Sequence, residues 1–173
     1  ESLITEREKT QMRGVLGEVG WRAEQSAPQH SAEVSLLLSQ VTIATVADLV
    51  TTNKLVTKVR QAAAQTIRVH AFEKADELVM AVWVDAAFEN RTKGKSTRGT
   101  VVGLAPAALL EGAEQPITFA SWRSGKIDRT CRSAPGSEAR AAIDGEDELY
   151  LCRFEWAELI GNVPNLRRPD DMV

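Results

Sequence analysis

The chain has 173 residues, of which 43% are hydrophobic and 26% charged, a balance that is normal for a soluble globular protein and argues against a disordered chain. No apolar run approaches the roughly 20 residues that a membrane-spanning helix needs, and the N-terminus lacks the apolar stretch of a signal peptide. The net charge of -3 argues against general affinity for nucleic acid, yet residues 91–132 hold eight basic and three acidic side chains. That segment is predicted either to follow a phosphate backbone or to form solvated loop surface.

The cysteines and histidines indicate neither a disulfide scaffold nor a metal site. Cys131 and Cys152 are too few for a disulfide framework or a four-thiolate zinc site, so we expect free thiols in a reducing, intracellular compartment. His30 and His70 are isolated and are predicted to be surface or helix-capping side chains. The chain lacks an initiator Met and ends in RRPDDMV, which favours a piece of a longer reading frame.

The first part of the chain predicts helices, because apolar side chains recur there at helical spacing over residues 5–24, 31–40 and 45–64. Thr5 is the expected N-cap of the first helix, and Glu8 completes a capping box. Ser31 is the expected cap of the second helix, and Thr45 or Thr42 of the third. We interpret the apolar stripes of these helices as a packed core.

The hydrophobic period changes near residue 66, which indicates strands. Alternating or continuous apolar residues predict them over residues 66–72, 78–84, 96–104 and 116–123. Short loops favour an antiparallel meander of the last three. A long helix follows, with Ser133 as its cap and an end near Ile160. Its expected apolar face carries Ala139, Ala142, Ile143, Glu146, Leu149, Tyr150, Trp156 and Ile160.

Two carboxylates occupy positions suited to a metal site. Asp85 is predicted to end the apolar strand, where an unpaired charge is costly, and Glu138 lies in the first turn of the long helix. A meander followed by a helix can bring such residues together, and Mg²⁺ prefers hard oxygen ligands of this kind. The alternatives are a turn residue for Asp85 and a helix-stabilising charge for Glu138.

Four segments, in this order, resemble the ribonuclease H domain of copia-type retrotransposon polyproteins. Residues 84–88 (VDAAF) are similar to the first active-site strand of that family, and residues 95–99 (KSTRG) to its second-strand signature. Residues 117–126 (ITFASWRSGK) resemble the third strand, and residues 137–141 (SEARA) the helix that bears a second catalytic carboxylate. The upstream helices resemble the end of the reverse transcriptase, so the resemblance covers nearly the whole chain.

The resemblance implies an α/β, ribonuclease H-like fold in residues 66–173, with residues 1–65 as a helical reverse-transcriptase tail. It implies hydrolysis of the RNA strand of RNA–DNA hybrids by two Mg²⁺ ions, for which Mn²⁺ can substitute, with Asp85 and Glu138 as catalytic ligands. The implied partners are the hybrid and the remainder of the polyprotein, with no membrane. The residues expected to contact nucleic acid are Arg91, Lys93, Lys95, Ser96, Arg98, Arg123 and Lys126.

The chain departs from the family pattern after the long helix, where a strand ending in a third catalytic Asp is expected. Asp170 and Asp171 follow Arg-Arg-Pro and do not fit that strand, so we expect a domain that stops short and is inactive alone. The acidic residues on the long helix are predicted to be a solvated face: Asp144, Glu146, Asp147 and Glu148.

Two other functions remain open from the sequence. A non-catalytic ribonuclease H-like or connection module would bind the template–primer duplex through its basic loops. An accidental likeness would leave a small α/β interaction protein with affinity neither for divalent metals nor for duplex.

Overall fold

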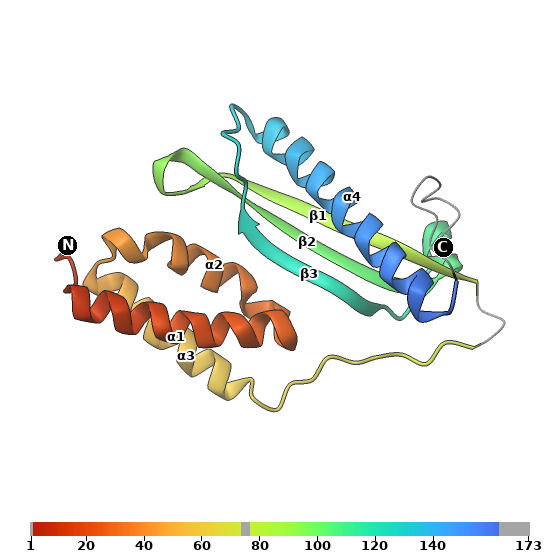
Figure 1. Ribbon diagram of the computed structural model, residues 1–173, viewed down its shortest axis with the longest axis horizontal. Coiled ribbons are helices and arrows are strands. Elements are labelled where there is room, and N and C mark those ends of the chain that lie inside the picture. Colours follow the sequence, from red (N-terminus) through yellow and green to blue (C-terminus); the bar gives the residue numbers. More distant parts are fainter. Residues whose placement is uncertain (1, 74–76, 163–173) are drawn as a thin grey trace.

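The computed structural model describes residues 2–73 and 77–162, which form a helical body and a sheet covered by one long helix (Figure 1). The helical body comprises α1 (Glu6–Gln25), α2 (Ser31–Gln40) and α3 (Val46–Gln61), joined through the short 3₁₀ turns η1 (Pro28–His30) and η2 (Val41–Ile43). None of the described helices is both long and apolar enough to cross a membrane.

Two of the three helix caps predicted for the helical body are confirmed. The Thr5 backbone N–H donates to the Glu8 carboxylate at 2.7 Å, while the Glu8 N–H donates to the Thr5 hydroxyl at 3.3 Å. Thr45 forms the same reciprocal capping box at the start of α3. The prediction for Ser31 is wrong, because η1 runs directly into α2 and Ser31 is already its first helical residue.

The three helices pack around an apolar core of their own. Its buried side chains come from all three helices and from the segments between them: Ile4, Met12, Leu16, Val19, Val34, Leu37, Val41, Ala44, Leu55 and Val59. The predicted apolar stripes of these helices are therefore confirmed as core. His30 is also buried here, at 7% exposure, which corrects the prediction of a surface or capping histidine.

The sheet is the predicted antiparallel meander of β1 (Leu78–Arg91), β2 (Lys95–Pro106) and β3 (Thr118–Lys126), in the order β1-β2-β3. The expected strand over residues 66–72 is wrong, because that segment is an extended connection without regular structure (Figure 1). A segment with an alternating apolar pattern becomes a strand only where a neighbouring strand pairs with its backbone N–H and C=O groups. Here the His70 N–H instead donates to the Thr118 side chain at 2.9 Å.

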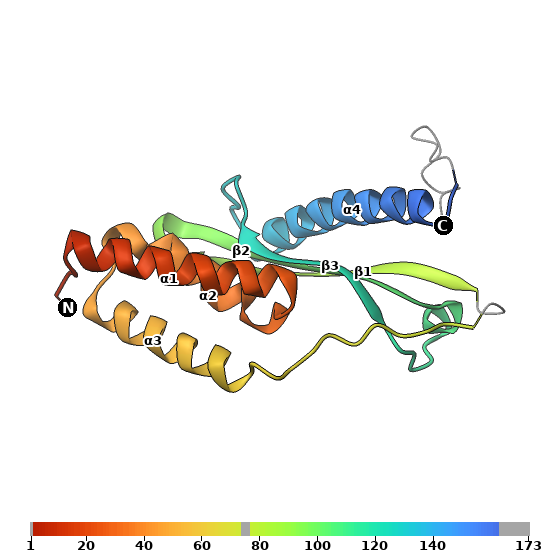
Figure 2. The ribbon, with the colours of Figure 1, turned by 60° about the horizontal axis from the view of Figure 1, so that its bottom comes forward.

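The two faces of the sheet meet different elements (Figure 2). Residues directly opposite one another on paired strands share a face, so Trp83, Val101 and Trp122 lie on one side. The Trp122 indole N–H donates to the Ala23 carbonyl at 2.8 Å, so this side faces the helical body. The next row along the strands, which includes Val84, faces the long helix α4 (Ala134–Leu159).

Helix α4 begins where predicted but packs through an unexpected face. The Ser133 hydroxyl accepts from the Gly136 N–H at 3.2 Å, which confirms the cap. Ile143, on the predicted apolar face, is 51% exposed. A Cβ at Gly145 would collide with Val84, so the absence of a side chain permits the close approach of α4 to β1. The buried residues of α4 are mostly small: Ser137, Ala141, Gly145, Cys152 and Ala157.

The observed architecture is therefore mixed α/β, with a three-stranded antiparallel sheet and helices, which confirms the coarse class that the sequence predicts.

Candidate functional site

Asp85 does not end β1. The strand continues to Arg91, and the chain turns only at the 3₁₀ turn η3 (Thr92–Gly94), where Lys93 and Gly94 have positive φ angles of 62°. Asp85 pairs with Gly99 in the middle of the ladder. It belongs to the Trp83 side of the sheet, so its carboxylate faces the helical body, beside a hollow of about 290 Å³.

Glu138 lies in the first turns of α4 and is exposed. It precedes Gly145, the point of closest approach to β1, by seven residues, or roughly 10 Å along the helix axis. Because α4 covers the opposite face of the sheet from Asp85, the two carboxylates are not brought together. No group of three or more potential metal ligands occurs within residues 2–73 and 77–162. The predicted Asp85–Glu138 metal pair is thus absent from this arrangement.

Arg91 and Ser96, both predicted to contact nucleic acid, are buried, at 7% and 1% exposure. The Arg91 guanidinium donates to the Thr97 hydroxyl at 2.8 Å and to the carbonyl and hydroxyl of Ser35 in α2 at 3.0 and 2.6 Å. The Ser96 hydroxyl accepts from the Glu89 N–H at 3.1 Å. Both side chains therefore hold the β1–β2 hairpin in place and are unavailable to a phosphate.

Arg98 and Arg123 point from the sheet toward α4. Arg98 pairs with Asp144, and Arg123 Nε lies 3.2 Å from the Glu148 carboxylate. The Ser121 hydroxyl, from the same face, donates to Glu148 at 2.5 Å. The Asp144 and Glu148 side chains are only 8% and 11% exposed, so the predicted solvated face is wrong for these two residues.

The spacing of the two carboxylates along the helix could have indicated these ion pairs from the sequence. Asp144 and Glu148 are four residues apart and thus share a helix face, which also includes the small residues Ala141 and Gly145. Buried carboxylates require partners, and two arginines on adjacent strands supply them. Arg140 adds a second cation to Asp144, at 2.8 Å.

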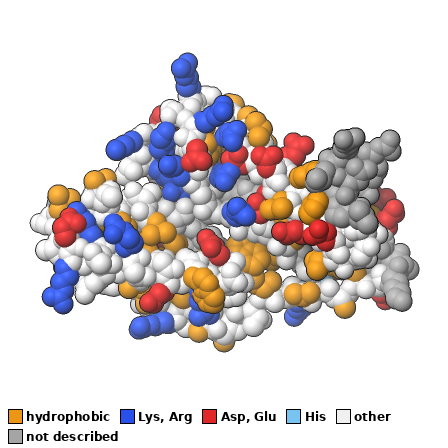
Figure 3. Space-filling model, viewed as in Figure 1, with side chains coloured by type: hydrophobic (Ala, Val, Ile, Leu, Met, Phe, Trp, Pro, Cys, Tyr) orange, Lys and Arg blue, Asp and Glu red, His pale blue; other side chains and the backbone are white. Residues whose placement is uncertain are grey.

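The remaining predicted basic residues lie near the hairpin tip and the start of α4. Lys93 is exposed, Lys95 donates to the Thr130 hydroxyl at 2.9 Å, and Lys126 lies 3.9 Å from Asp128. Lysine and arginine side chains gather over this end of the molecule in Figure 3. We call the exposed and half-exposed members the basic rim, namely Lys93, Lys95, Lys126, Arg129 and Arg132.

The rim also includes Arg129 and Arg132, which belong to the predicted basic segment 91–132 but are not among the individual residues expected to contact nucleic acid. They lie in the loop between β3 and α4. That loop is fixed at Ile127, which is fully buried and whose N–H donates to the Ser96 carbonyl at 2.9 Å. Exposed lysine and arginine side chains of this kind are suited to contact phosphates.

The Cys152 thiol is not suited to nucleophilic chemistry in this structure. Both cysteines are free, as predicted. Burial, with smaller contributions from Glu148 and Glu155, raises the pKa of the Cys152 thiol to about 11, so it is uncharged near neutral pH.

Asp170 and Asp171, which do not fit the family's third catalytic position in the sequence, lie outside the described residues.

Comparison with protein-family models, curated proteins and solved structures finds no match to this chain. Family membership accordingly remains a prediction from the four sequence motifs, and the fold is assigned only as mixed α/β with a three-stranded antiparallel sheet.

Proposed function

We propose that this chain is a ribonuclease H-like module of a retrotransposon polyprotein and that, as it stands, it binds RNA–DNA hybrids without cleaving them. The observation that carries the proposal is the order of elements. The four motif segments fall in β1, at the start of β2, in β3 and at the start of α4, and the three strands form one antiparallel meander with α4 across one face. The basic rim supplies the phosphate contacts.

The arrangement of carboxylates favours binding over hydrolysis. Two-metal hydrolysis of a phosphodiester needs carboxylates that converge on ions about 4 Å apart. Asp85 and Glu138 lie on opposite faces of the sheet, so this donor set does not fit a shared Mg²⁺ or Mn²⁺ site.

Hydrolysis of the RNA strand is the second candidate, favoured because Asp85 and Glu138 occupy the motif positions of the family's catalytic carboxylates. It requires a rearranged β1 register or further acidic ligands from the remainder of the polyprotein. The expected hydrolase would still use the same basic rim to hold the hybrid.

The binding proposal is tested by fluorescence anisotropy with a labelled RNA–DNA hybrid over a series of salt concentrations. Neutralising three lysines of the rim should weaken binding and reduce the salt slope by about three, since each phosphate contact contributes roughly one. The variant carries Lys93→Ala, Lys95→Ala and Lys126→Ala. The matched control removes three exposed basic residues of the helical body, Arg7, Lys54 and Arg60. Equal losses in both triple variants would contradict a binding role for the rim.

The catalytic candidate is tested by incubating the chain, and a longer polyprotein segment that includes it, with the hybrid and Mg²⁺ or Mn²⁺. We expect no RNA cleavage by the chain itself. If the chain cleaves RNA and both Asp85→Asn and Glu138→Gln abolish cleavage while hybrid affinity persists, the binding-only proposal fails and the hydrolase assignment replaces it.

A further inference from the structure

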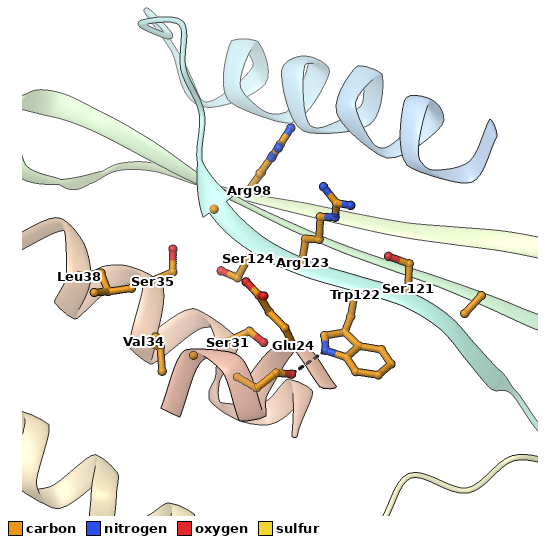
Figure 4. Close-up of a pocket in the computed structure, with 14 residues that line it drawn as sticks. Glu24, Ser31, Val34, Ser35, Leu38, Arg98, Ser121, Trp122, Arg123 and Ser124 are labelled. Atoms are coloured by element: carbon orange, nitrogen blue, oxygen red, sulfur yellow. Dashed lines mark hydrogen bonds between the residues drawn. The ribbon is translucent and has the colours of Figure 1, made fainter. Parts of the chain in front are cut away.

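A groove of about 580 Å³ separates the helical body from β3 (Figure 4). Its volume lies within the usual range for ligand sites. One wall comes from α1 and α2 and the other from six consecutive residues of β3, 120–125. The side chains that matter below are Glu24, Ser31, Trp122 and Ser124. The proposed function assigns no role to this groove.

The groove favours a cation. The Glu24 carboxylate points from α1 toward Ser124, beside the Trp122 ring (Figure 4). Glu24 forms no ion pair within the part of the chain that the structure describes. Arg98 and Arg123 contribute to the same groove, but their guanidinium groups turn to Asp144 and Glu148 on the far face of the sheet. A phosphate would thus meet a carboxylate there and no free guanidinium.

The groove also offers polar and aromatic partners for a cationic head group. The Ser31 hydroxyl is buried and has no hydrogen-bond partner among the described residues. Buried hydroxyls ordinarily have one, so this oxygen is available to a donor from a ligand. The Trp122 ring, held by its bond to the Ala23 carbonyl, presents a surface on which a guanidinium or ammonium group is stabilised.

The exposed backbone edge of β3 favours a ligand in an extended, strand-like conformation. The order β1-β2-β3 leaves β3 as an edge strand, with no neighbouring strand on its outer side in residues 2–73 and 77–162. Edge strands accept extended peptides by forming backbone hydrogen bonds with them. Residues 120–125 line the groove continuously, which is long enough for a short peptide strand.

We propose that this groove binds an extended peptide that pairs with the outer edge of β3 and places a lysine or arginine side chain against Glu24 and Trp122. The partner is thus a basic, strand-forming segment of another polypeptide. Asp85 lies beside the adjoining hollow, which shares Ser31 and Trp122 with the groove, and is a second carboxylate nearby.

The test uses a fluorescein-labelled hexapeptide of alternating valine and arginine, titrated with the full chain and followed by anisotropy. A hexapeptide of alternating valine and glutamate tests charge selection, and an arginine peptide N-methylated at alternate residues tests backbone pairing. Glu24→Gln should weaken binding of the arginine peptide about tenfold, because one charge-assisted contact is lost. Glu18→Gln makes the same change on an exposed part of α1 outside the groove and should leave affinity unchanged.

Three results would overturn the proposal: equal affinity for the arginine and glutamate peptides, equal effects of Glu24→Gln and Glu18→Gln, or full binding of the N-methylated peptide. Circular dichroism of both variants checks that each keeps its fold. Hybrid affinity, measured in parallel, should be unaffected by Glu24→Gln, so the proposed function and this inference can fail separately.

Discussion

Replacing Arg91 with methionine separates a structural role from a nucleic-acid contact. The substitution keeps an apolar stem of similar length and removes the guanidinium, which makes three hydrogen bonds to Thr97 and Ser35. Two of these bonds join the hairpin to α2, so the variant weakens the attachment of the sheet to the helical body.

The expected loss of stability follows from those bonds. Hydrogen bonds made by charged groups contribute about 1.5–3 kcal/mol each. Burial opposes the charge, however, and lowers the pKa of the Arg91 guanidinium, so part of that gain is offset. We expect Arg91→Met to reduce the free energy of unfolding by about 2–4 kcal/mol. At roughly 2–4 °C per kcal/mol, the Tm should fall by about 5–15 °C.

Urea unfolding followed by tryptophan fluorescence measures this change, with the exposed Arg129→Met as the matched control. The control should stay within about 0.5 kcal/mol of the wild-type chain. The reasoning is refuted if Arg91→Met unfolds like the control, or if it loses affinity for an RNA–DNA hybrid at unchanged stability. The second result would restore Arg91 as a phosphate contact.

Four further substitutions test the packing of two glycines, the cap of α3 and the pH dependence of stability. In thermal melts, Gly145→Ala should destabilise the protein by about 1–3 kcal/mol, because the added methyl group collides with Val84. In the same melts Gly17→Ala, whose methyl group would lie in open space on α1, should stabilise the protein by about 0.5–1 kcal/mol. Thr45→Ala should cost about 0.5–2 kcal/mol in urea unfolding by removing the α3 cap, and an unchanged midpoint would contradict the cap. Burial lowers the pKa of His30 in the folded state, so the unfolded chain binds the proton more readily and stability is lost as pH falls below about 6.5. His30→Gln should therefore flatten the pH dependence of urea unfolding between about pH 5 and pH 7. An equally steep dependence in the variant would exclude His30 as its cause.

Several elements could be predicted from the sequence because their signals are local. A capping box needs only a Thr and an acidic residue three positions later, as at Thr5 and Thr45, and the cap at Ser133 is similarly contained within four residues. Apolar periodicity likewise located the three meander strands and all four long helices. These interactions form between residues close in the chain, whatever the rest of the fold does.

The predictions that proved wrong concern features that depend on a partner distant in the sequence. Residues 66–72 alternate like a strand, but no neighbouring strand completes their ladder. The predicted apolar face of α4 is exposed near Ile143. A different face packs on the sheet, because it permits close contact with β1 and pairs its carboxylates with arginines of the sheet. Such partners become neighbours only after folding.

The candidate site illustrates the same division. By itself, the sequence determined which residues could carry the chemistry, namely two carboxylates in family motifs and a basic segment. Only the tertiary structure decided that β1 runs past Asp85, so that strand alternation directs this carboxylate to one face while α4 holds Glu138 on the other. It also buried Arg91 and left Glu24 facing a groove. Side-chain direction depends on register and on the layers above and below the sheet, and those are set by packing across the whole chain.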